Sequence, residues 1–232
     1  WSAEAEPDPA GVHTLVAQDE THALTLRLEP AKPPVAHGAA GISQKGKDVS
    51  QASHYYSFTR LSTTGSLTID GEQFEVSGTS WMDHEFGSSE LGADQVGWDW
   101  FSIQLDDNTE LMLYGMRLKD GSRDLASSGT LISSDGRTRH LEVTDFQIES
   151  TATWRSSESK ATYPAKWRLK FPSLDLVLDV VPLLADQELR TSRSTMVSYW
   201  EGAVAVIGTK RGQPVKGQGY VELTGYTERL KL

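Results

Sequence analysis

Short runs of alternating residues, separated by turn signals, are the feature that most constrains the fold of this chain. Asp-Gly, which favours tight hairpin turns, occurs at residues 70–71, 120–121 and 135–136. The clearest hairpin joins 66–69 to 73–77 through the first of these turns. Alternation predicts further strands at 21–28, 54–61, 175–181, 199–208 and 218–226.

Helical periodicity is hard to find. The best short candidate is 183–190, and this segment could also be a loop. Strand-length runs spaced by turns are typical of antiparallel barrels and sandwiches. The pattern therefore predicts an all-β fold.

Composition excludes several classes of protein. The 232 residues include 22 Lys and Arg against 32 Asp and Glu, a net charge of −10. An acidic chain without basic runs is a poor partner for nucleic acid. No apolar run approaches the roughly 18 residues of a membrane span. Cysteine is absent, which excludes disulfides, thiolate metal sites and a cysteine nucleophile.

Ionisable and aromatic residues are concentrated in 80–107. Buried acids and histidines need partners, whereas such a mixture suits a pocket where an apolar ligand meets proton-active groups. The alternative is a solvated turn beside core tryptophans. The residues concerned are Trp81, Asp83, His84, Glu85, Phe86, Trp98, Asp99 and Trp100.

A hairpin around Asp106-Asp107-Asn108 determines which way these aromatics point. With Asn108 in the left-handed conformation, a three-residue loop is expected to pair Asp106 with Glu110 and Asp99 with Arg117. One face would then be an aliphatic core of Phe101, Ile103, Leu105, Leu111 and Leu113. The other would be mixed, with Trp98, Trp100, Ser102, Gln104, Met112, Tyr114 and Met116.

The mixed face suits a ligand-lined barrel interior or an inter-domain cleft, and equally the packing of the aromatics against another domain. A second aromatic–acid cluster, Tyr199-Trp200-Glu201, is either a cleft wall or a structural pair. The six histidines are scattered without metal-binding spacing, so no metal site is predicted. Nothing in the sequence identifies a catalytic triad.

Six blocks carry a resemblance to a known family. They begin with Trp-Met-Asp-His-Glu-Phe-Gly-Ser-Ser and occupy 81–89, 97–107, 110–114, 182–189, 199–204 and 219–226. In this order they resemble the AttH/CrtC group of lipocalin-like proteins, over about 30–226. That group includes carotenoid 1,2-hydratases, kievitone-hydratase-like proteins and proteins labelled as secreted hydrolases.

The resemblance implies tandem lipocalin-like antiparallel β-barrels, the first one incomplete. Residues 1–93 would be the C-terminal part of the first barrel and 94–232 the second. Relatives carry a further N-terminal segment, so the chain is expected to be truncated relative to the family. A periplasmic or secreted location in bacteria is also implied.

The resemblance further maps catalytic roles onto Asp83, His84, Glu85 and Tyr114, with His84 working with Tyr114. Contacts to a hydrophobic ligand are expected from Trp81, Phe86, Trp98, Trp100, Met116, Tyr199, Trp200 and Glu201. Two departures matter. Phe86 stands where many relatives have Trp, and Met116 stands where carotenoid hydratases are expected to have an acid.

Two functions follow as hypotheses. The first is a cofactor-independent hydratase or isomerase that acts on a hydrophobic, isoprenoid- or polyketide-like substrate in a cleft at the junction of the two barrels. Protonation of an alkene needs an acid in an apolar pocket and aromatic faces for the cation. The second is a non-catalytic lipocalin-type carrier of a hydrophobic ligand in the bacterial envelope.

Overall fold

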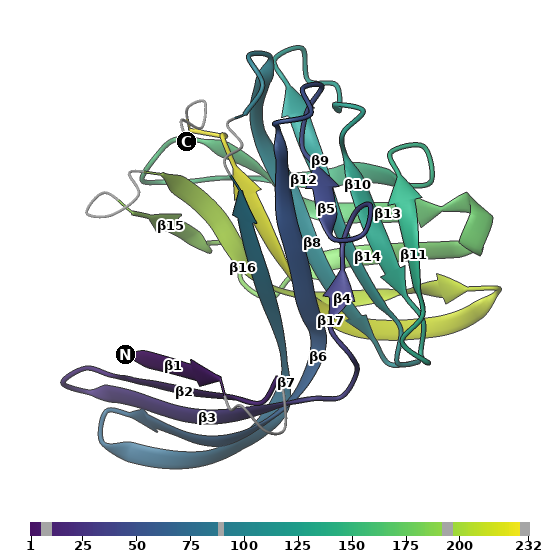
Figure 1. Cartoon of the computed structure of the whole chain (residues 1–232). Coiled ribbons are helices and arrows are strands. Elements are labelled where there is room, and N and C mark those ends of the chain that lie inside the picture. The colour runs from purple at the N-terminus through teal and green to yellow at the C-terminus, as the bar shows by residue number, and fades with distance from the viewer. Residues whose placement is uncertain (6–10, 88–90, 192–196, 228–232) are drawn as a thin grey trace. The chain divides into compact units, whose positions relative to one another are not determined.

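A computed structural model describes residues 1–5, 11–87, 91–191 and 197–227, which are almost entirely β structure (Figure 1). In these ranges the helical content is limited to the 3-10 turn η1 (Pro172–Leu174). The all-β prediction is therefore confirmed. The segment 183–190 is not a helix and contains the short strand β15 (Glu188–Arg190).

None of the helical segments within the described ranges is long and apolar enough to cross a membrane. Ser88 and Ser89, the last two residues of the first resemblance block, lie outside the described residues.

The chain forms two compact units. The first comprises Trp1–Ala36 and Tyr56–His84, and the second comprises His37–Tyr55 and Glu85–Leu232. The division at 93/94 that the resemblance implies is a different one and stays a prediction. Two long strands, β6 (Ala52–Ile69) and β7 (Glu72–Gly87), contribute residues to both units.

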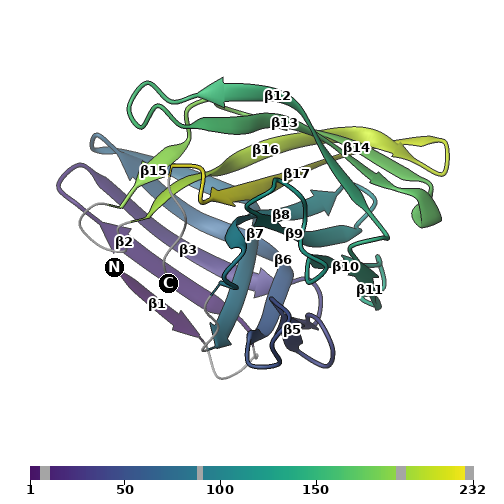
Figure 2. The same cartoon turned by 90° about the horizontal axis from the view of Figure 1, so that it is seen from above.

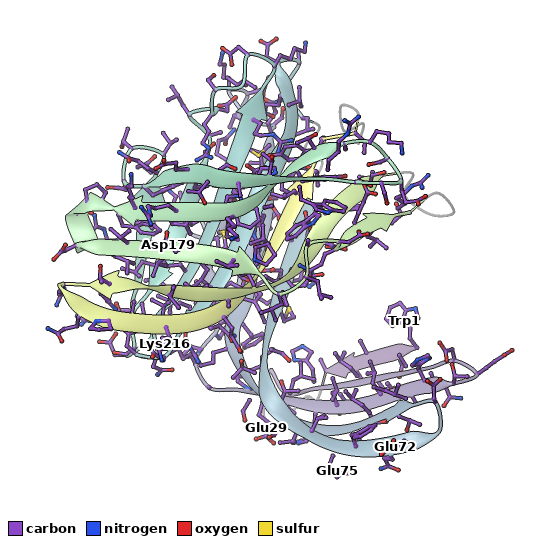
Figure 3. All side chains as sticks on the ribbon, turned by 180° about the vertical axis from the view of Figure 1, so that it is seen from behind. Trp1, Glu29, Glu72, Glu75, Asp179 and Lys216 are labelled. Carbon is purple, nitrogen blue, oxygen red and sulfur yellow. The ribbon has the colours of Figure 1, made fainter. Side chains whose placement is uncertain are left out.

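The first unit is built on a sheet in which the strand order is β1–β2–β3–β6, with β4 and β7 also paired to β6. The predicted Asp70-Gly71 turn between β6 and β7 is confirmed, because both residues have positive φ, 51° and 84°. Glu72 and Glu75 lie just beyond it on β7 (Figure 3). The remaining strands of this unit are β1 (Ser2–Ala5), β2 (His13–Gln18), β3 (His22–Pro30) and β4 (Val35–Ala36).

The two β-prone runs predicted at 54–61 and 66–69 are parts of one strand, β6. Gly65 allows β6 to continue because it adopts φ 152°, and a Cβ there would lie 2.0 Å from the carbonyl oxygen of Thr25. A small apolar cluster of Leu28, Phe58 and Leu61 packs in this unit.

The second unit is a ten-stranded antiparallel sheet in the order β11–β10–β9–β8–β17–β16–β14–β13–β12, with β15 paired to β16. In Figure 2, β12 and β13 form one side of the curled sheet and β8, β9 and β10 the other. Its strands are β8 (Gln95–Leu105), β9 (Glu110–Leu118), β10 (Ser128–Ile132), β11 (Thr138–Glu142), β12 (Gln147–Arg155), β13 (Thr162–Phe171), β14 (Leu176–Pro182), β16 (Ser198–Lys210) and β17 (Gln213–Thr224). Strand β5 (Ile42–Gln44) pairs with the start of β6 in the same unit.

The inside of this curled sheet is filled by one apolar core. The predicted aliphatic face of β8 and β9 supplies part of it, and residues of β13, β14 and β16 supply the opposite side. The side chains are almost fully buried, including Phe101, Ile103, Leu105, Leu111, Leu113, Trp167, Leu169, Leu178, Trp200 and Val206. The barrel interior is therefore a packed core, and the alternative of a ligand-lined interior for the mixed face is wrong.

The β8–β9 hairpin confirms the predicted faces but corrects the register. Gln104, not Asp106, pairs with Glu110, and Trp100 pairs with Tyr114. The loop is three residues long and Asn108 is left-handed (φ 62°), as predicted. However, the left-handed residue is the last of such a loop, so the loop is 106–108. The two-residue shift keeps every side chain on its predicted face and separates Asp106 from Glu110.

The predicted partnership of Asp99 and Arg117 exists, although Asp99 pairs in register with Gly115. The ion pair is diagonal and buried, with 6% of the Asp99 side chain and 14% of the Arg117 side chain exposed. It is therefore not the exposed rim pair that the sequence suggested.

Candidate functional site

One row of side chains crosses the outer face of the second unit. The strand registers place Glu201 opposite Glu222, Glu222 opposite Trp100, Trp100 opposite Tyr114, and Tyr114 opposite Ser128. Opposed residues point to the same side of a sheet, and this side is the one away from the core. We call it the mixed face; it also carries Trp98, Met112, Met116, Tyr199 and Tyr220.

Tyr114 anchors the segment 37–55 on this face. Its hydroxyl donates to the carbonyl of Gln44 at 3.0 Å, accepts from the hydroxyl of Ser128 at 2.9 Å, and lies 3.0 Å from the hydroxyl of Ser43. Only 3% of Tyr114 is exposed. A phenol with three such partners is held firmly and has little capacity left for a substrate.

Lys45 lies directly above Tyr114. Its Nζ is 3.9 Å from the centre of the Tyr114 ring and 5.2 Å from that of Tyr55, so it makes cation–π contacts. The same Nζ is 2.8 Å from a carboxylate oxygen of Glu85, which also accepts from the hydroxyl of Ser53 at 2.5 Å. The Glu85 side chain keeps 37% exposure. This Lys45–Glu85 ion pair is therefore partly accessible to solvent.

Two half-buried tryptophans lie on the same mixed face. The indole N–H of Trp100 donates to the hydroxyl of Tyr55 at 3.1 Å, which links it to the ring beneath Lys45. The indole N–H of Trp98 donates to Glu222 at 2.7 Å. Both tryptophans keep partial exposure, so the mixed face offers aromatic surface between two sets of carboxylates.

The other residues predicted to contact a ligand lie in different environments. Tyr199 and Glu201 lie on the mixed face, but Trp200 points the opposite way, is fully buried in the core and donates to the carbonyl of Ala185 at 2.9 Å. Met116 is on the mixed face and is buried. Phe86 is 55% exposed and stacks on His54 at 5.3 Å.

The remaining predicted residues belong to the first unit. His84 is exposed and stacks on Tyr56, with 5.2 Å between the ring centres. Asp83 accepts hydrogen bonds from the hydroxyl of Ser57 and, at 2.9 Å, from the indole N–H of Trp81. Of the four predicted catalytic residues, Glu85 and Tyr114 are brought together, through Lys45.

Four further residues of this site were not predicted from the sequence: Lys45, Tyr55, Ser43 and Glu222. Glu222 stands in a resemblance block, whereas Lys45 stands in a polar segment with no motif. Its position depends on β5 pairing with β6 and on contacts about 70 residues away along the chain, which no local pattern reveals.

No group of three or more His, Asp or Glu residues suited to hold a metal ion occurs among the described residues.

A buried histidine also belongs to this site. His37 is fully buried, with its Nδ1 2.9 Å from the hydroxyl of Thr130 and its ring 4.4 Å from that of Tyr55. Burial lowers the pKa of His37 to about 3, and the positive charges of Lys45 and His140 contribute. His37 is therefore a neutral residue of the network at physiological pH.

His37 predicts a loss of stability in mild acid. The unfolded chain binds a proton at this histidine below about pH 6.5 whereas the folded chain does not, so stability falls as pH falls, by up to about 1.4 kcal/mol per pH unit. Urea unfolding between about pH 7 and pH 5 should show this slope, and His37→Gln should flatten it. His22→Gln, at an exposed position, is the control. An unchanged slope in His37→Gln would contradict the prediction.

The curled antiparallel sheet with a solid apolar core places the second unit in the lipocalin-like class of all-β folds. The sequence model of the AttH-like family matches residues 1–226, and the chain belongs to that family. The assignment to the carotenoid-hydratase branch and the N-terminal truncation stay predictions.

Solved structures agree with this placement. A crystal structure of an AttH protein from Nitrosomonas europaea is 37% identical, with a TM-score of 0.87 over 97% of this chain and 67% of that one. Kievitone hydratase from Nectria haematococca is 21% identical, with a TM-score of 0.79 over 98% of this chain and 68% of that one, and shows the shared fold.

A curated relative is named as a dehydratase. The dehydratase AsqC of Emericella nidulans is 21% identical over 218 residues, covering 91% of this chain and 59% of the relative. The chain thus spans less than two thirds of the length of this relative.

Proposed function

We propose that this chain is part of a hydratase-type enzyme. It would add water to, or remove water from, a carbon–carbon double bond of a hydrophobic, isoprenoid- or polyketide-like substrate. The names of two similar proteins, a dehydratase and kievitone hydratase, support this class of reaction. The proposed place is the mixed face of the second unit, because the inside of the sheet is occupied by the core.

The Lys45–Glu85 pair beside Trp100 is the observation that carries the proposal. Addition of water needs a group that orients the water molecule and takes its proton, and a carboxylate paired with an ammonium group can do both. It also needs a cation-stabilising surface, which the faces of Trp98 and Trp100 offer. Tyr114 is then a positioning residue that supports Lys45 from below.

Transfer of labelled oxygen tests this function. The protein is incubated in H₂¹⁸O with kievitone, other prenylated phenols and acyclic isoprenoid alkenes, and mass spectrometry follows uptake or loss of one labelled water. Uptake by at least one probe is expected. Glu85→Gln and Lys45→Met should each lower the rate by about 100-fold or more. Wild-type protein that modifies none of these probes would count against the proposal.

A matched control separates catalysis from general electrostatics. Lys170 forms a comparable ion pair with Glu149 at 3.0 Å, but both side chains are exposed, at 40% and 57%. Lys170→Met should leave the labelling rate unchanged. If Lys45→Met fails to fold, the nearly isosteric Glu85→Gln still decides the outcome, with its melting temperature as the check of folding.

His84 and Asp83 keep their predicted role as a proposal. The His84→Gln variant is measured in the same assay, and an unchanged labelling rate would remove His84 from the mechanism.

The envelope location implied by the resemblance is also a proposal, and fractionation of the source cells tests it.

A non-catalytic carrier is the second candidate. Half-buried aromatics on the mixed face favour it as much as they favour an enzyme, since they provide an apolar surface. It is distinguished by stable binding of a probe whose mass does not change in H₂¹⁸O.

A further inference from the structure

Two carboxylates face each other on the mixed face. Glu201 on β16 and Glu222 on β17 are directly opposed in register, and such residues have Cβ atoms about 4.5–5.5 Å apart. Glu222 accepts the hydrogen bond from the indole N–H of Trp98. Among the described residues, no hydrogen bond or ion pair to the Glu201 carboxylate is found.

Partial burial raises the pKa of the Glu201 carboxyl. A second carboxylate that approaches it disfavours the ionised form further, and the register places Glu222 where its side chain can do so. Tyr220, on the same face, has a pKa raised to about 12 by burial and by both carboxylates, so it stays neutral and adds no further negative charge.

The position of the pair within the row matters as much as its charge. Trp100 lies between two neighbours in the row. Glu222 is on one side of it, and Tyr114, with Lys45 above it, is on the other. Neighbouring strands are about 4.8 Å apart. A flat apolar substrate resting on the indoles of Trp98 and Trp100 would therefore have the carboxylate pair at one edge and the Lys45–Glu85 pair at the other.

We propose that Glu201, coupled to Glu222, is the acid that protonates the alkene carbon in the hydratase reaction. This inference rests on the proposed function. The acid is supplied by β16 and the carboxylate opposite it by β17, on the same face.

The Glu201 carboxyl gives its proton to one alkene carbon, and the π electron pair forms the new C–H bond. The neighbouring carbon becomes a cation, stabilised by the indole faces. The oxygen of a water molecule held at Lys45–Glu85 bonds to this carbon. The Glu85 carboxylate takes the proton released from that water and passes it through solvent back to Glu201, so that the net change is the addition of one water molecule.

The first experiment measures the proton directly. Protein labelled with ¹³C at glutamate carboxyls is titrated by NMR, and one carboxyl is expected to remain protonated well above the usual glutamate pKa of about 4.3. This signal should vanish in Glu201→Gln and move to lower pH in Glu222→Gln. Glu149→Gln, an exposed control, should leave it unchanged. Ionisation of both glutamates in the usual glutamate range would overturn the assignment.

The second experiment measures turnover in H₂¹⁸O with the probe that the wild type hydrates best. Glu201→Gln should lower kcat by about 100-fold or more, while Glu201→Asp restores part of the rate. An acid must be protonated to act, so kcat falls as pH rises through its pKa. Glu222→Gln removes the neighbouring charge and should move this fall to lower pH.

The outcomes separate the two proposals. Absence of turnover in the wild type with every probe contradicts the hydratase function, and with it the role of Glu201. Turnover that survives Glu201→Gln, or a pH profile that Glu222→Gln does not move, contradicts the acid assignment alone.

Discussion

Asp99→Asn is expected to lower the free energy of unfolding by about 3–5 kcal/mol, because it leaves a buried guanidinium without its counter-charge. Asp99 binds Arg117 and accepts at 2.9 Å from the hydroxyl of Tyr226, and Arg117 also donates to the carbonyl of Thr224 and lies 3.7 Å from the Tyr226 ring centre. Urea unfolding of wild type and variant measures the difference.

Asp179→Asn is the matched control for this prediction. Asp179 pairs with Arg168 at 2.7 Å on the surface of β14 (Figure 3), where the two side chains are 38% and 47% exposed. Such a pair contributes about 0–1 kcal/mol. Equal losses in the two variants would show that burial of the Asp99–Arg117 pair has no energetic consequence.

Trp200→Ala is expected to lower the stability of the protein, whereas Trp100→Ala is expected to weaken ligand binding. Trp200 is fully buried and packs 5.8 Å from the Trp167 ring centre, so its truncation should cost about 3–5 kcal/mol. Trp100 is half-buried on the mixed face. Trp100→Ala should therefore leave a folded protein that no longer shows quenching of tryptophan fluorescence by kievitone.

Thermal melts and fluorescence titrations check this pair of variants. If Trp100→Ala unfolds as readily as Trp200→Ala, Trp100 packs as a structural residue and the mixed face has lost its principal ligand surface.

The β8–β9 hairpin shows which structural features a local sequence pattern can predict. Alternation identified which side chains face the core, since the side-chain period of a strand is two residues. It could not distinguish two registers that differ by two residues, because both give the same faces. The placement of the left-handed Asn108 at the end of the loop decided between them.

The candidate site was predictable only in part. Trp98, Trp100, Tyr199 and Glu201 were identified from composition and resemblance, and they share one face. Trp200, chosen with its neighbours as one cluster, points into the core, as alternation along a strand requires. Lys45 and the opposition of Glu201 to Glu222 were not predicted, since both depend on which distant strands pair.

The sequence by itself determined the all-β class, the hairpin turns at Asp-Gly and the separation of an aliphatic from a mixed face. These features arise from interactions within a few residues, namely backbone conformation at turns and the alternation of side chains. Tertiary structure alone decided that the barrel interior is solid, that Asp99 and Arg117 are buried, and that Lys45 meets Glu85 above Tyr114. Burial and long-range pairing are properties of the folded chain, because they bring together residues that no local pattern connects.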